Sequence, residues 1–393
     1  MITAGAFLQE ATARGFDYFT GVPCSFLTPL INGVLSNRGL SYVGAASEGE
    51  AVAIAAGAWL AGRRTVVMCQ NSGLGNAVNP LTSLNAPFRI PTLFITTWRG
   101  EPGIADEPQH EVMGQITQKL LSLMGLAQEA FPASTPAIGP VLDRAIRHMD
   151  LVAQPFALVM RKTDLEDEVL DQVSLPARPN GQRVQQERAG PKPARAAVLE
   201  KLLELVDDNT GIIATTGKCG RELFTIADRP QHLYQVGSMG CATGMGLGVA
   251  LNTQRPIVVL DGDGAALMKL GSLATVGAYA PANLIHILLD NGVHDSTGGQ
   301  ATVSASVDFA AVALACGYCW AASCNTLDGF EAALMAAVEG PKPAFLHMRI
   351  ASGSMAKLGR PTISPADVAR RFQGFLVQAS DVTRRRTRAE SPA

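Results

Sequence analysis

Short apolar segments alternate with helical patterns along most of the chain. In the first part, strand-like apolar runs cover 18–20, 42–45, 65–69, 92–97 and 156–160, and helix-like patterns cover 2–14, 27–35 and 48–60. Apolar strands that alternate with helices of about 10 to 15 residues predict βαβ units and a parallel sheet. We therefore expect an α/β domain over residues 1–165.

A polar segment then separates this part from a second part with the same alternation. Residues 166–195 contain four prolines and two glycines without a sustained period, which predicts a linker between domains. We expect a second α/β domain over 196–380 and a disordered, arginine-rich tail over 381–393. The predicted strands of the second domain are 211–215, 319–322 and 344–350, and a strand–helix–strand unit lies within 258–299. Its predicted helices are 196–206, 309–315, 327–338 and one that begins at 219.

Composition narrows the class of protein. The 32 Lys and Arg residues nearly balance the 34 Asp and Glu residues, so the net charge of −2 gives no general attraction to nucleic acid or acidic membranes. The sequence has no apolar run long enough for a transmembrane helix and no signal peptide pattern at its start, so we expect a cytoplasmic protein. Seven scattered cysteines argue against a disulfide framework, and we expect them to be small buried hydrophobic residues.

The candidate chemistry begins at the two strand ends within 258–299. Asp263 stands in Gly262-Asp263-Gly264 after one apolar strand, and Asn291 follows the next strand, 28 residues later. A carboxylate, an amide oxygen and the backbone carbonyl of Val293 are suitable ligands for Mg²⁺ that also binds a diphosphate. The flanking glycines would let the backbone approach phosphate groups. The alternative is an ordinary β-turn-α-β unit.

This Gly-Asp-Gly…Asn pattern resembles the cofactor signature of thiamine diphosphate enzymes. The resemblance implies that residues 1–165 bind the aminopyrimidine of the cofactor, that 196–380 bind its diphosphate and Mg²⁺, and that no middle domain is present. It also implies a homodimer or higher homo-oligomer whose cofactor sites lie between chains.

The same resemblance implies a catalytic acid at the aminopyrimidine ring. Glu48 opens an alanine-rich helix nine residues before Gly57, as the catalytic glutamate of these enzymes does, whereas Glu50 does not fit that spacing. The alternative is that both glutamates only favour a helix N-terminus. Further cofactor contacts are implied in two glycine turns, at Asn71, Gly73 and Gly75 and at Gly237, Ser238 and Met239.

Longer blocks resemble the phosphonopyruvate decarboxylase family, which converts 3-phosphonopyruvate to phosphonoacetaldehyde and CO₂ in the biosynthesis of phosphonate natural products, antibiotics among them. These blocks include ASEGEAVAIAAG, QNSGLGNAVNPLTSL, WRGEPGIADEPQHEVMG, TTGKCGREL and DNGVHDSTGGQ, and they span nearly the whole chain. One departure is Asp290-Asn291, where many relatives have two asparagines. Because the second residue is the metal ligand, the departure leaves the metal site intact.

A substrate with a carboxylate and a phosphonate needs cations and donors near the reacting carbon. The candidates are Ser25, Arg99, Lys218 and Arg221, each with the alternative of an ordinary cap, salt bridge or surface charge. His110 and His294 are candidate proton donors, and Asp295 either orients His294 or ends its loop.

Four hypotheses about the function of the protein remain after these observations. The first is decarboxylation of phosphonopyruvate, and the second is the same chemistry on sulfopyruvate or another substituted pyruvate. A broad 2-oxoacid decarboxylase lies between them, and a thiamine diphosphate-binding protein without catalysis is the fourth. Retention of Glu48 argues against the last, and a nicotinamide-binding fold is disfavoured by the lack of a G-x-G-x-x-G turn before a helix.

Overall fold

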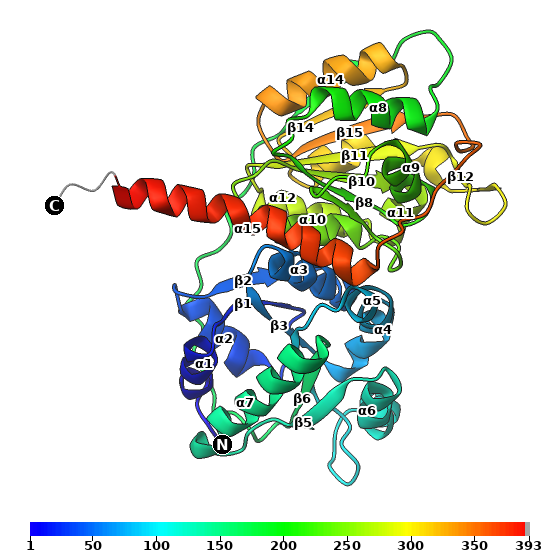
Figure 1. Cartoon of the computed structure of the whole chain (residues 1–393). Coiled ribbons are helices and arrows are strands. Elements are labelled where there is room, and N and C mark those ends of the chain that lie inside the picture. The colour runs from blue at the N-terminus through cyan, green and yellow to red at the C-terminus, as the bar shows by residue number, and fades with distance from the viewer. Residues whose placement is uncertain (390–393) are drawn as a thin grey trace. The chain divides into compact units, whose positions relative to one another are not determined.

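The computed structural model describes residues 1–389 and side chains up to residue 377. The chain divides into two compact units, one of Met1–Trp59 with Arg63–Ser174 and one of Leu60–Gly62 with the chain from Leu175 onwards (Figure 1). The division between Ser174 and Leu175 falls inside the segment that the sequence predicts to be a linker.

The first unit contains a six-stranded parallel sheet in the order β2-β1-β3-β4-β6-β5. All five strands expected from the apolar pattern are present, and β5, which pairs with β6 at one edge, is additional. β5 has the sequence Ala-Gln-Glu-Ala and is half-exposed, so it carries no apolar run that sequence reasoning could detect. The strands are β1 Phe16–Gly21, β2 Ser41–Gly44, β3 Arg64–Cys69, β4 Leu93–Thr97, β5 Ala127–Ala130 and β6 Phe156–Met160.

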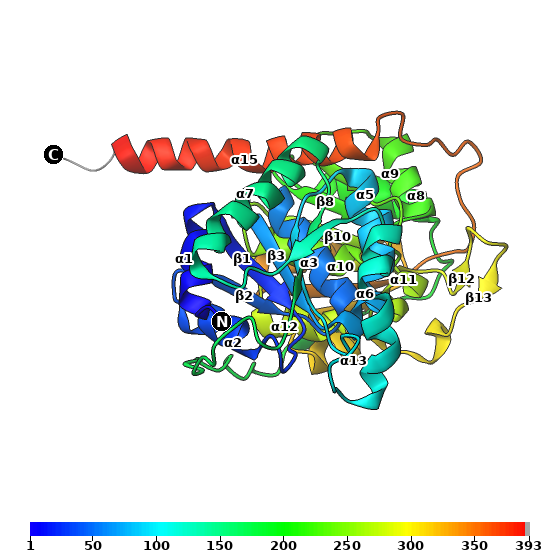
Figure 2. The same cartoon turned by 90° about the horizontal axis from the view of Figure 1, so that it is seen from below.

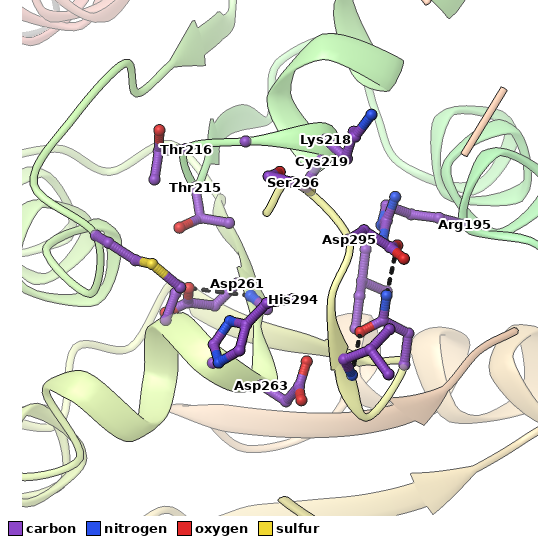
Figure 3. A pocket seen from close by; sticks show the side chains of 18 of the residues that line it. Arg195, Thr215, Thr216, Lys218, Cys219, Asp261, Asp263, His294, Asp295 and Ser296 are labelled. Atoms are coloured by element: carbon purple, nitrogen blue, oxygen red, sulfur yellow. Dashed lines mark hydrogen bonds and ion pairs between the residues drawn. The ribbon is translucent and has the colours of Figure 1, made fainter. Parts of the chain in front are cut away.

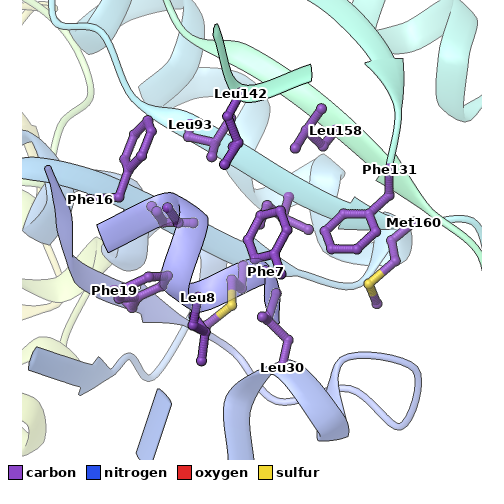
Figure 4. Packing of buried hydrophobic residues seen from close by; sticks show 14 of the residues in the cluster. Phe7, Leu8, Phe16, Phe19, Leu30, Leu93, Phe131, Leu142, Leu158 and Met160 are labelled. Carbon is purple, nitrogen blue, oxygen red and sulfur yellow. The ribbon is translucent and has the colours of Figure 1, made fainter. Parts of the chain in front are cut away.

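Helices cover both faces of this sheet because successive residues of each buried strand point to opposite sides. One core contains Leu93, Leu158 and Met160 of the sheet with Phe7 of α1 and with Phe131 (Figure 4). The ring centroids of Phe7 and Phe131 are 4.7 Å apart. The other core contains the alternate strand residues with the alanine-rich helix α3. The helices are α1 Ala4–Ala13, α2 Thr28–Ser36, α3 Glu48–Leu60, η1 Asn71–Gly73, α4 Leu74–Pro80, η2 Leu81–Asn85, α5 Ala86–Phe88, η3 Pro108–His110, α6 Glu111–Leu123 and α7 Thr135–Val152.

The second unit contains a seven-stranded parallel sheet in the order β7-β14-β15-β11-β10-β8-β9, so both sheets are parallel as expected. Helices α8, α9 and α14 lie on one face, and α10, α12 and α13 lie on the other (Figure 1). A short antiparallel hairpin, β12 with β13, projects from this unit (Figure 2). The strands are β7 Gln182–Gln186, β8 Gly211–Ala214, β9 His232–Tyr234, β10 Ile257–Gly262, β11 Leu284–Asp290, β12 Val293–His294, β13 Gln300–Ala301, β14 Trp320–Cys324 and β15 Ala344–Arg349.

Two expectations about the second part need correction. β7 lies within 166–195, so this segment is not only a linker: it adds an edge strand that pairs with β14. Its polar sequence, Gln-Arg-Val-Gln-Gln, is mostly exposed and therefore has no apolar signature. The helices are α8 Arg195–Leu205, α9 Lys218–Ile226, α10 Ala242–Ala250, α11 Asp263–Met268, α12 Ser272–Tyr279, η4 Ser304–Ser306, α13 Phe309–Ala315, α14 Leu327–Glu339 and α15 Pro365–Ala389.

The last helix, α15, continues to Ala389 and so enters the segment 381–393 that was expected to be disordered. Four of the residues 381–389 are arginine, a good helix former, which favours this extension. Residues 390–393 lie outside the described residues. Within residues 1–389, no helix is both long and apolar enough to cross a membrane.

Candidate active site

A cavity of about 220 Å³ lies in the second unit at the carboxyl ends of β8, β10 and β11 (Figure 3). Ligands collect at this edge of parallel sheets because the loops that follow adjacent strands meet there. β10 and β11 are neighbours in register, with Gly262 opposite Leu289, so the loops that follow them begin side by side. The predicted residues that line the cavity are Lys218, Met239, Gly262, Asp263, Gly264, Asn291, Val293 and His294.

Asp263 is the first residue of α11 and is 3% exposed. Burial raises the pKa of its carboxyl group, and the hydrogen bond from the Thr302 hydroxyl to Oδ2, 2.5 Å long, acts in the opposite direction. The negative charge of Asp290 raises this pKa further. A carboxylate whose charge is penalised in this way would be stabilised by a cation.

The turn after β11 orients Asn291 through both ends of its amide. Its Nδ2 donates to Asp295 Oδ2 at 2.6 Å, and its Oδ1 accepts from the backbone N–H of Val293 at 3.2 Å. Gly292 between them has φ +74°, a left-handed conformation that favours glycine. An amide oxygen has two lone pairs, so Oδ1 retains capacity for a further partner.

Asp290, the departure from the family pattern, serves the sheet rather than the cavity. Its carboxylate accepts from His347 Nε2 at 2.9 Å, from the Ser304 hydroxyl and from the N–H of Gly292. Burial raises its pKa, but these hydrogen bonds and the charge of His347 outweigh burial and hold the pKa below its ordinary value. Asp290 therefore has its own partners, and of these two neighbouring residues only Asn291 lines the cavity.

The glycines of the Gly-Asp-Gly turn show how this cavity would fit a diphosphate and a metal. Gly262 has φ −105°, which any residue adopts, and a Cβ added there would meet no atom within 4 Å. Neither backbone strain nor crowding therefore requires a glycine at position 262. Because Gly262 lines the cavity, a side chain there would occupy part of the cavity volume. Among the described residues, no group of three or more His, Cys, Asp or Glu side chains could hold a metal ion. A metal here would depend on mixed oxygen ligands, which suits Mg²⁺ shared with phosphate.

Gly264 is required for a different reason. A Cβ at Gly264 would lie 2.7 Å from Cε1 of His294 and 3.3 Å from Cε of Met239. The side chains of His294 and Met239 therefore converge over this turn, and His294 lies close to Asp263 in the view of Figure 3.

Met239 belongs to the turn between β9 and α10. Ser238 has φ +52°, which is uncommon for a residue with a side chain, and its carbonyl accepts from Nε2 of Gln235 at 2.7 Å. Gly240 has φ +88°. This left-handed pair turns the chain so that Met239 lines the cavity, whereas Gly237 and Ser238 are not among the lining residues.

The predicted cations of the α9 turn are separated by the structure. Arg221 does not line the cavity: its Nε and Nη2 donate to the carbonyls of Gly359 and Leu358 at 2.9 and 3.1 Å. Lys218 lines the cavity, but its ammonium group points away from His294 and Asp263 in Figure 3.

Arg195, Thr215 and Asp261 are among the lining residues that were not found from the sequence. Arg195 is the last residue of the predicted linker, and Asp261 lies in the apolar strand just before Gly262-Asp263-Gly264, so neither belongs to a motif that was recognised. Thr215 directly follows β8, and that position at a strand end is a signal that could have found it.

In the first unit, the two glutamates at the start of α3 have different surroundings. Glu50 is 1% exposed, its Oε2 accepts from the N–H of Ala46 at 2.6 Å, and its own N–H donates to the Ser47 hydroxyl. This reciprocal pattern is close to a capping box. Glu48 is half-buried, and its Oε2 accepts from Nδ2 of Asn76 at 2.9 Å. Glu50 thus stabilises the helix start, whereas the Glu48 carboxylate takes no part in this cap.

The glycine turn after β3 lies against Glu48. A Cβ at Gly73 would overlap Oε1 of Glu48, so this glycine permits the approach of the carboxylate. Gly75 is exposed in α4, and a Cβ there would meet no atom within 4 Å.

Asn71, in contrast, is completely buried. Its Nδ2 donates to the carbonyl of Arg99 and to the Thr117 hydroxyl, and its Oδ1 accepts from the N–H of Arg99. Asn71 therefore holds the loop after β4 in place.

Two predicted substrate contacts come together at the ends of β1 and β4. Nη1 of Arg99 donates to the Ser25 hydroxyl at 3.0 Å. The other edge of the guanidinium pairs with Asp106 through Nε at 2.8 Å and Nη2 at 2.5 Å. The hydrogen bond from Arg99 holds the pKa of Asp106 far below its usual range. Asp106 was not predicted, and only its loop position beside Arg99 could have indicated it.

His110 ends the short helix η3 in this unit and is 6% exposed. Its Nδ1 is buried without a hydrogen-bond partner among the described residues. Of the two predicted proton donors, only His294 lines the cavity of the second unit.

Comparison with known families defines the class of protein. Residues 1–121 match the model "Thiamine pyrophosphate enzyme, N-terminal TPP binding domain" and 215–348 match "Thiamine pyrophosphate enzyme, C-terminal TPP binding domain". The solved structure described as "a putative thiamin diphosphate-dependent enzyme isolated from Mycobacterium smegmatis" is similar with a TM-score of 0.69, at 14% identity, covering 90% of this chain and all of that chain. A 4-hydroxybenzoylformate decarboxylase from Rhodococcus jostii RHA1 is similar to the same degree, at 13% identity. These two likenesses concern the fold alone.

Two curated sequences narrow the class to a family. The phosphonopyruvate decarboxylases of Streptomyces hygroscopicus and Streptomyces viridochromogenes are each 48% identical to this chain, over 96% of this chain and 95% of theirs. The sulfopyruvate decarboxylase of Methanosarcina acetivorans is 28% identical over 92% of this chain and 94% of its own length. The chain belongs to the phosphonopyruvate decarboxylase family of thiamine pyrophosphate enzymes.

Proposed function

We propose that this protein decarboxylates 3-phosphonopyruvate to phosphonoacetaldehyde and CO₂, with thiamine diphosphate and Mg²⁺ as cofactors, in the biosynthesis of phosphonate natural products, including antibiotics. The observation that carries the proposal is the 48% identity to two phosphonopyruvate decarboxylases over nearly their whole length. The polar residues at the strand ends of both units support it, because they are of the kinds that this reaction needs.

In the second unit, Asp263, Asn291 and the Val293 carbonyl would hold Mg²⁺ beside the diphosphate. The open space at Gly262 would admit phosphate oxygens close to the backbone. Met239 would support the cofactor from the turn before α10, with Gly237 and Ser238 as neighbouring backbone contacts. When bound, thiamine diphosphate supplies the electron sink for the pair of electrons released as the bond to the carboxylate breaks.

In the first unit, Glu48 would hold a proton at the aminopyrimidine ring. Its hydrogen bond with Asn76 and its contact with Gly73 restrict the direction of the carboxylate. Asn71 at the start of the same turn is anchored to Arg99 and Thr117, and Gly75 presents no side chain at the exposed surface of α4. A positioned carboxylate in such a place contributes by general acid–base catalysis.

Arg99 and Ser25 would bind the phosphonate. Asp106 takes one edge of the guanidinium, so the N–H groups not given to Asp106 or Ser25 remain for an anion. Lys218 is one of the cations that line the cavity of the other unit. Arg221 would contribute by holding the chain near Gly359. His294 or His110 would deliver the proton that replaces CO₂.

Sulfopyruvate is the second candidate substrate, because a sulfopyruvate decarboxylase of similar length is 28% identical. A sulfonate carries one negative charge where a phosphonate can carry two, so the number of cations that face the group would discriminate between them.

The test is CO₂ and aldehyde release from phosphonopyruvate, sulfopyruvate and pyruvate, measured in parallel with and without thiamine diphosphate and Mg²⁺. Turnover of phosphonopyruvate with a kcat/KM at least about 100-fold above the other two, a difference of about 2.7 kcal/mol, is expected. A preference for sulfopyruvate would overturn the substrate but keep the chemistry.

We also propose that the enzyme acts in the cytoplasm as a homodimer or a higher homo-oligomer, with each cofactor site shared between chains. Analytical ultracentrifugation of the full chain with both cofactors tests this, and a monomer with full activity would contradict it.

A further inference from the structure

Arg195 is a buried cation at the cavity that no motif indicates. It is the first residue of α8, its side chain is 8% exposed, and it lines the cavity beside Asp295 (Figure 3). A guanidinium that is removed from water needs partners that offset the loss of hydration, so its contacts indicate what it does.

The guanidinium of Arg195 joins three segments of the second unit. Nη2 donates to Asp295 Oδ2 at 2.8 Å, and Nη1 faces Glu222 Oε1 at 3.3 Å and the carbonyl of Gly353 at 3.4 Å. Glu222 is fully buried in α9, and its Oε1 also accepts from the N–H of Met355 at 3.0 Å. Arg195 therefore ties α9 and the segment after β15 to the loop that contains Asp295.

Asp295 transmits this constraint to Asn291. Oδ2 of Asp295 accepts from Arg195 and from Nδ2 of Asn291, and its Oδ1 accepts from the N–H of Gly353 at 3.2 Å. An ionised carboxylate can only accept, so the amide edge of Asn291 that faces Asp295 must be the NH₂ group. The oxygen of that amide is thereby directed to the opposite side.

Charge balance makes this arrangement dependent on Arg195. One guanidinium faces two carboxylates that are 0% and 13% exposed. Without the guanidinium, both carboxylates would remain in a poorly hydrated place without their cation, which is strongly unfavourable. Asp295 would then be free to turn towards water and would release the amide of Asn291.

We propose that Arg195 is a positioning residue of the metal site, which acts through Asp295 to keep the amide oxygen of Asn291 available to Mg²⁺. The inference rests on the Mg²⁺ site of the proposed function. Groups that orient a metal ligand commonly affect metal affinity by 10- to 100-fold when they are removed.

The test is isothermal titration of Mg²⁺ into the full chain in the presence of thiamine diphosphate and without substrate. Arg195→Met is expected to raise the Kd of Mg²⁺ by about 10- to 100-fold. Arg195→Lys keeps the charge but cannot reach Asp295 and Glu222 with one planar fork, so an intermediate loss is expected. A wild-type Mg²⁺ affinity in a folded Arg195→Met protein would overturn the inference.

Asp295→Asn changes the residue that links Arg195 to Asn291. It tests the same inference if Arg195→Met does not fold. Its side-chain amide can present either edge to Asn291, so weaker Mg²⁺ binding is expected. Because both residues act along one route, the double variant should bind Mg²⁺ no more weakly than the weaker single variant. Losses that add in the double variant, or Asp295→Asn with wild-type affinity, would overturn the route through Asp295.

Arg371→Met is the matched control. Arg371 makes two hydrogen bonds to Asp228, at 2.6 and 3.0 Å, and neither residue lines the cavity. This control should lower the Tm and leave the Kd of Mg²⁺ unchanged, which separates loss of an ion pair from loss of positioning. If wild type binds no Mg²⁺, the proposed metal site fails first and the role of Arg195 fails with it, whereas failure to turn over phosphonopyruvate leaves the role of Arg195 intact.

Discussion

At the residue scale, Glu48 and Glu50 show how two nearby residues with the same chemistry acquire different surroundings. The Glu50 carboxylate accepts from the N–H of Ala46 and stabilises the start of the helix. The Glu48 carboxylate meets the side chain of Asn76 and the bare backbone of Gly73. Spacing along the sequence favoured Glu48, and the hydrogen bonds of Glu50 give an independent reason for the same choice.

We expect Glu48→Gln to lower kcat by about 10²- to 10⁴-fold, since the amide cannot hold or release the proton at the cofactor. The Tm should stay near that of wild type, because glutamine can still accept from Asn76. Glu50→Ala is the control: it should destabilise the protein by about 0.5 to 2 kcal/mol through the lost cap and leave the kcat of the folded protein within a few-fold of wild type. Equal losses of kcat in both variants would contradict this assignment.

The Arg99–Asp106 pair presents a cation in a fixed direction. Asp106 also accepts from the backbone N–H groups of Gly100 and Glu107, each at 2.8 Å. These hydrogen bonds fix its carboxylate within the loop that follows Arg99. Arg99 is thereby held on one edge while its other edge reaches Ser25.

We expect Asp106→Asn to raise the KM for phosphonopyruvate by about 10-fold or more and to change kcat less, because a loosened Arg99 binds the phosphonate less well. Steady-state kinetics on phosphonopyruvate and pyruvate test this, and an unchanged KM would contradict it.

The same pair should also appear in the pH dependence of stability. The pKa of Asp106 in the folded protein lies below its unfolded value of about 3.9, so its ionised form stabilises the fold. This contribution is full above about pH 4 and declines as the pH falls towards the folded pKa. The difference in unfolding free energy between wild type and Asp106→Asn should therefore shrink below about pH 4, and a difference that grows on acidification would reverse the sign.

At the element scale, the turn between β10 and α11 combines two glycines with opposite surroundings. A Cβ on Gly262 would meet no protein atom within 4 Å, whereas a Cβ on Gly264 would collide with His294. The two positions therefore separate an effect on bound ligand from an effect on the protein itself.

We expect Gly262→Ala to leave the Tm of the cofactor-free protein at or slightly above that of wild type, because alanine fits this backbone conformation. It should weaken thiamine diphosphate binding, because the methyl group takes cavity space. Gly264→Ala, in contrast, should weaken cofactor binding and also lower the Tm, since His294 and Met239 must move. Gly5→Ala in α1, where a Cβ also meets no atom, controls for the substitution itself and should not change cofactor binding. Differential scanning calorimetry and cofactor titration measure both effects, and a Gly262→Ala protein with wild-type cofactor affinity would contradict the assignment.

At the scale of the whole molecule, the two units repeat one design. Each has a parallel sheet with helices on both faces, and in each the polar residues of interest follow strands at the carboxyl edge. The first unit offers Glu48 and Arg99 there, and the second offers Asp263, Asn291 and His294. A buried acid such as Asp263 gains from a bound cation, so cofactor binding should be linked to stability.

We expect thiamine diphosphate and Mg²⁺ at about 100 times their Kd to raise the unfolding free energy by about 2.7 kcal/mol, and EDTA to reverse the gain. Asp263→Asn should fold but lose most of this Mg²⁺-dependent gain. Thermal unfolding with and without EDTA tests it, and an Asp263→Asn protein that retains the full gain would remove Asp263 from the metal site.

The sequence by itself determined the α/β class, both parallel sheets and most strands, because short continuous apolar runs that alternate with helical patterns are typical of buried parallel strands. Motifs with fixed spacing also selected Glu48, Asp263 and Asn291 as candidates, and Asp263 and Asn291 do line the cavity. The sequence did not show β5, β7 or β9, since two of these are short polar edge strands and the third has only three residues.

Only the tertiary structure decided which charges face the cavity. Arg221 and Lys218 stand in one turn, yet Arg221 is used by the carbonyls of Leu358 and Gly359 while Lys218 lines the cavity. Arg195 meets Asp295, 100 residues further along the chain, and Glu222 on another helix. Such pairs form when loops from separate strands close on one edge of a sheet, and because their free energy depends on distance and burial in space, no local sequence pattern encodes them.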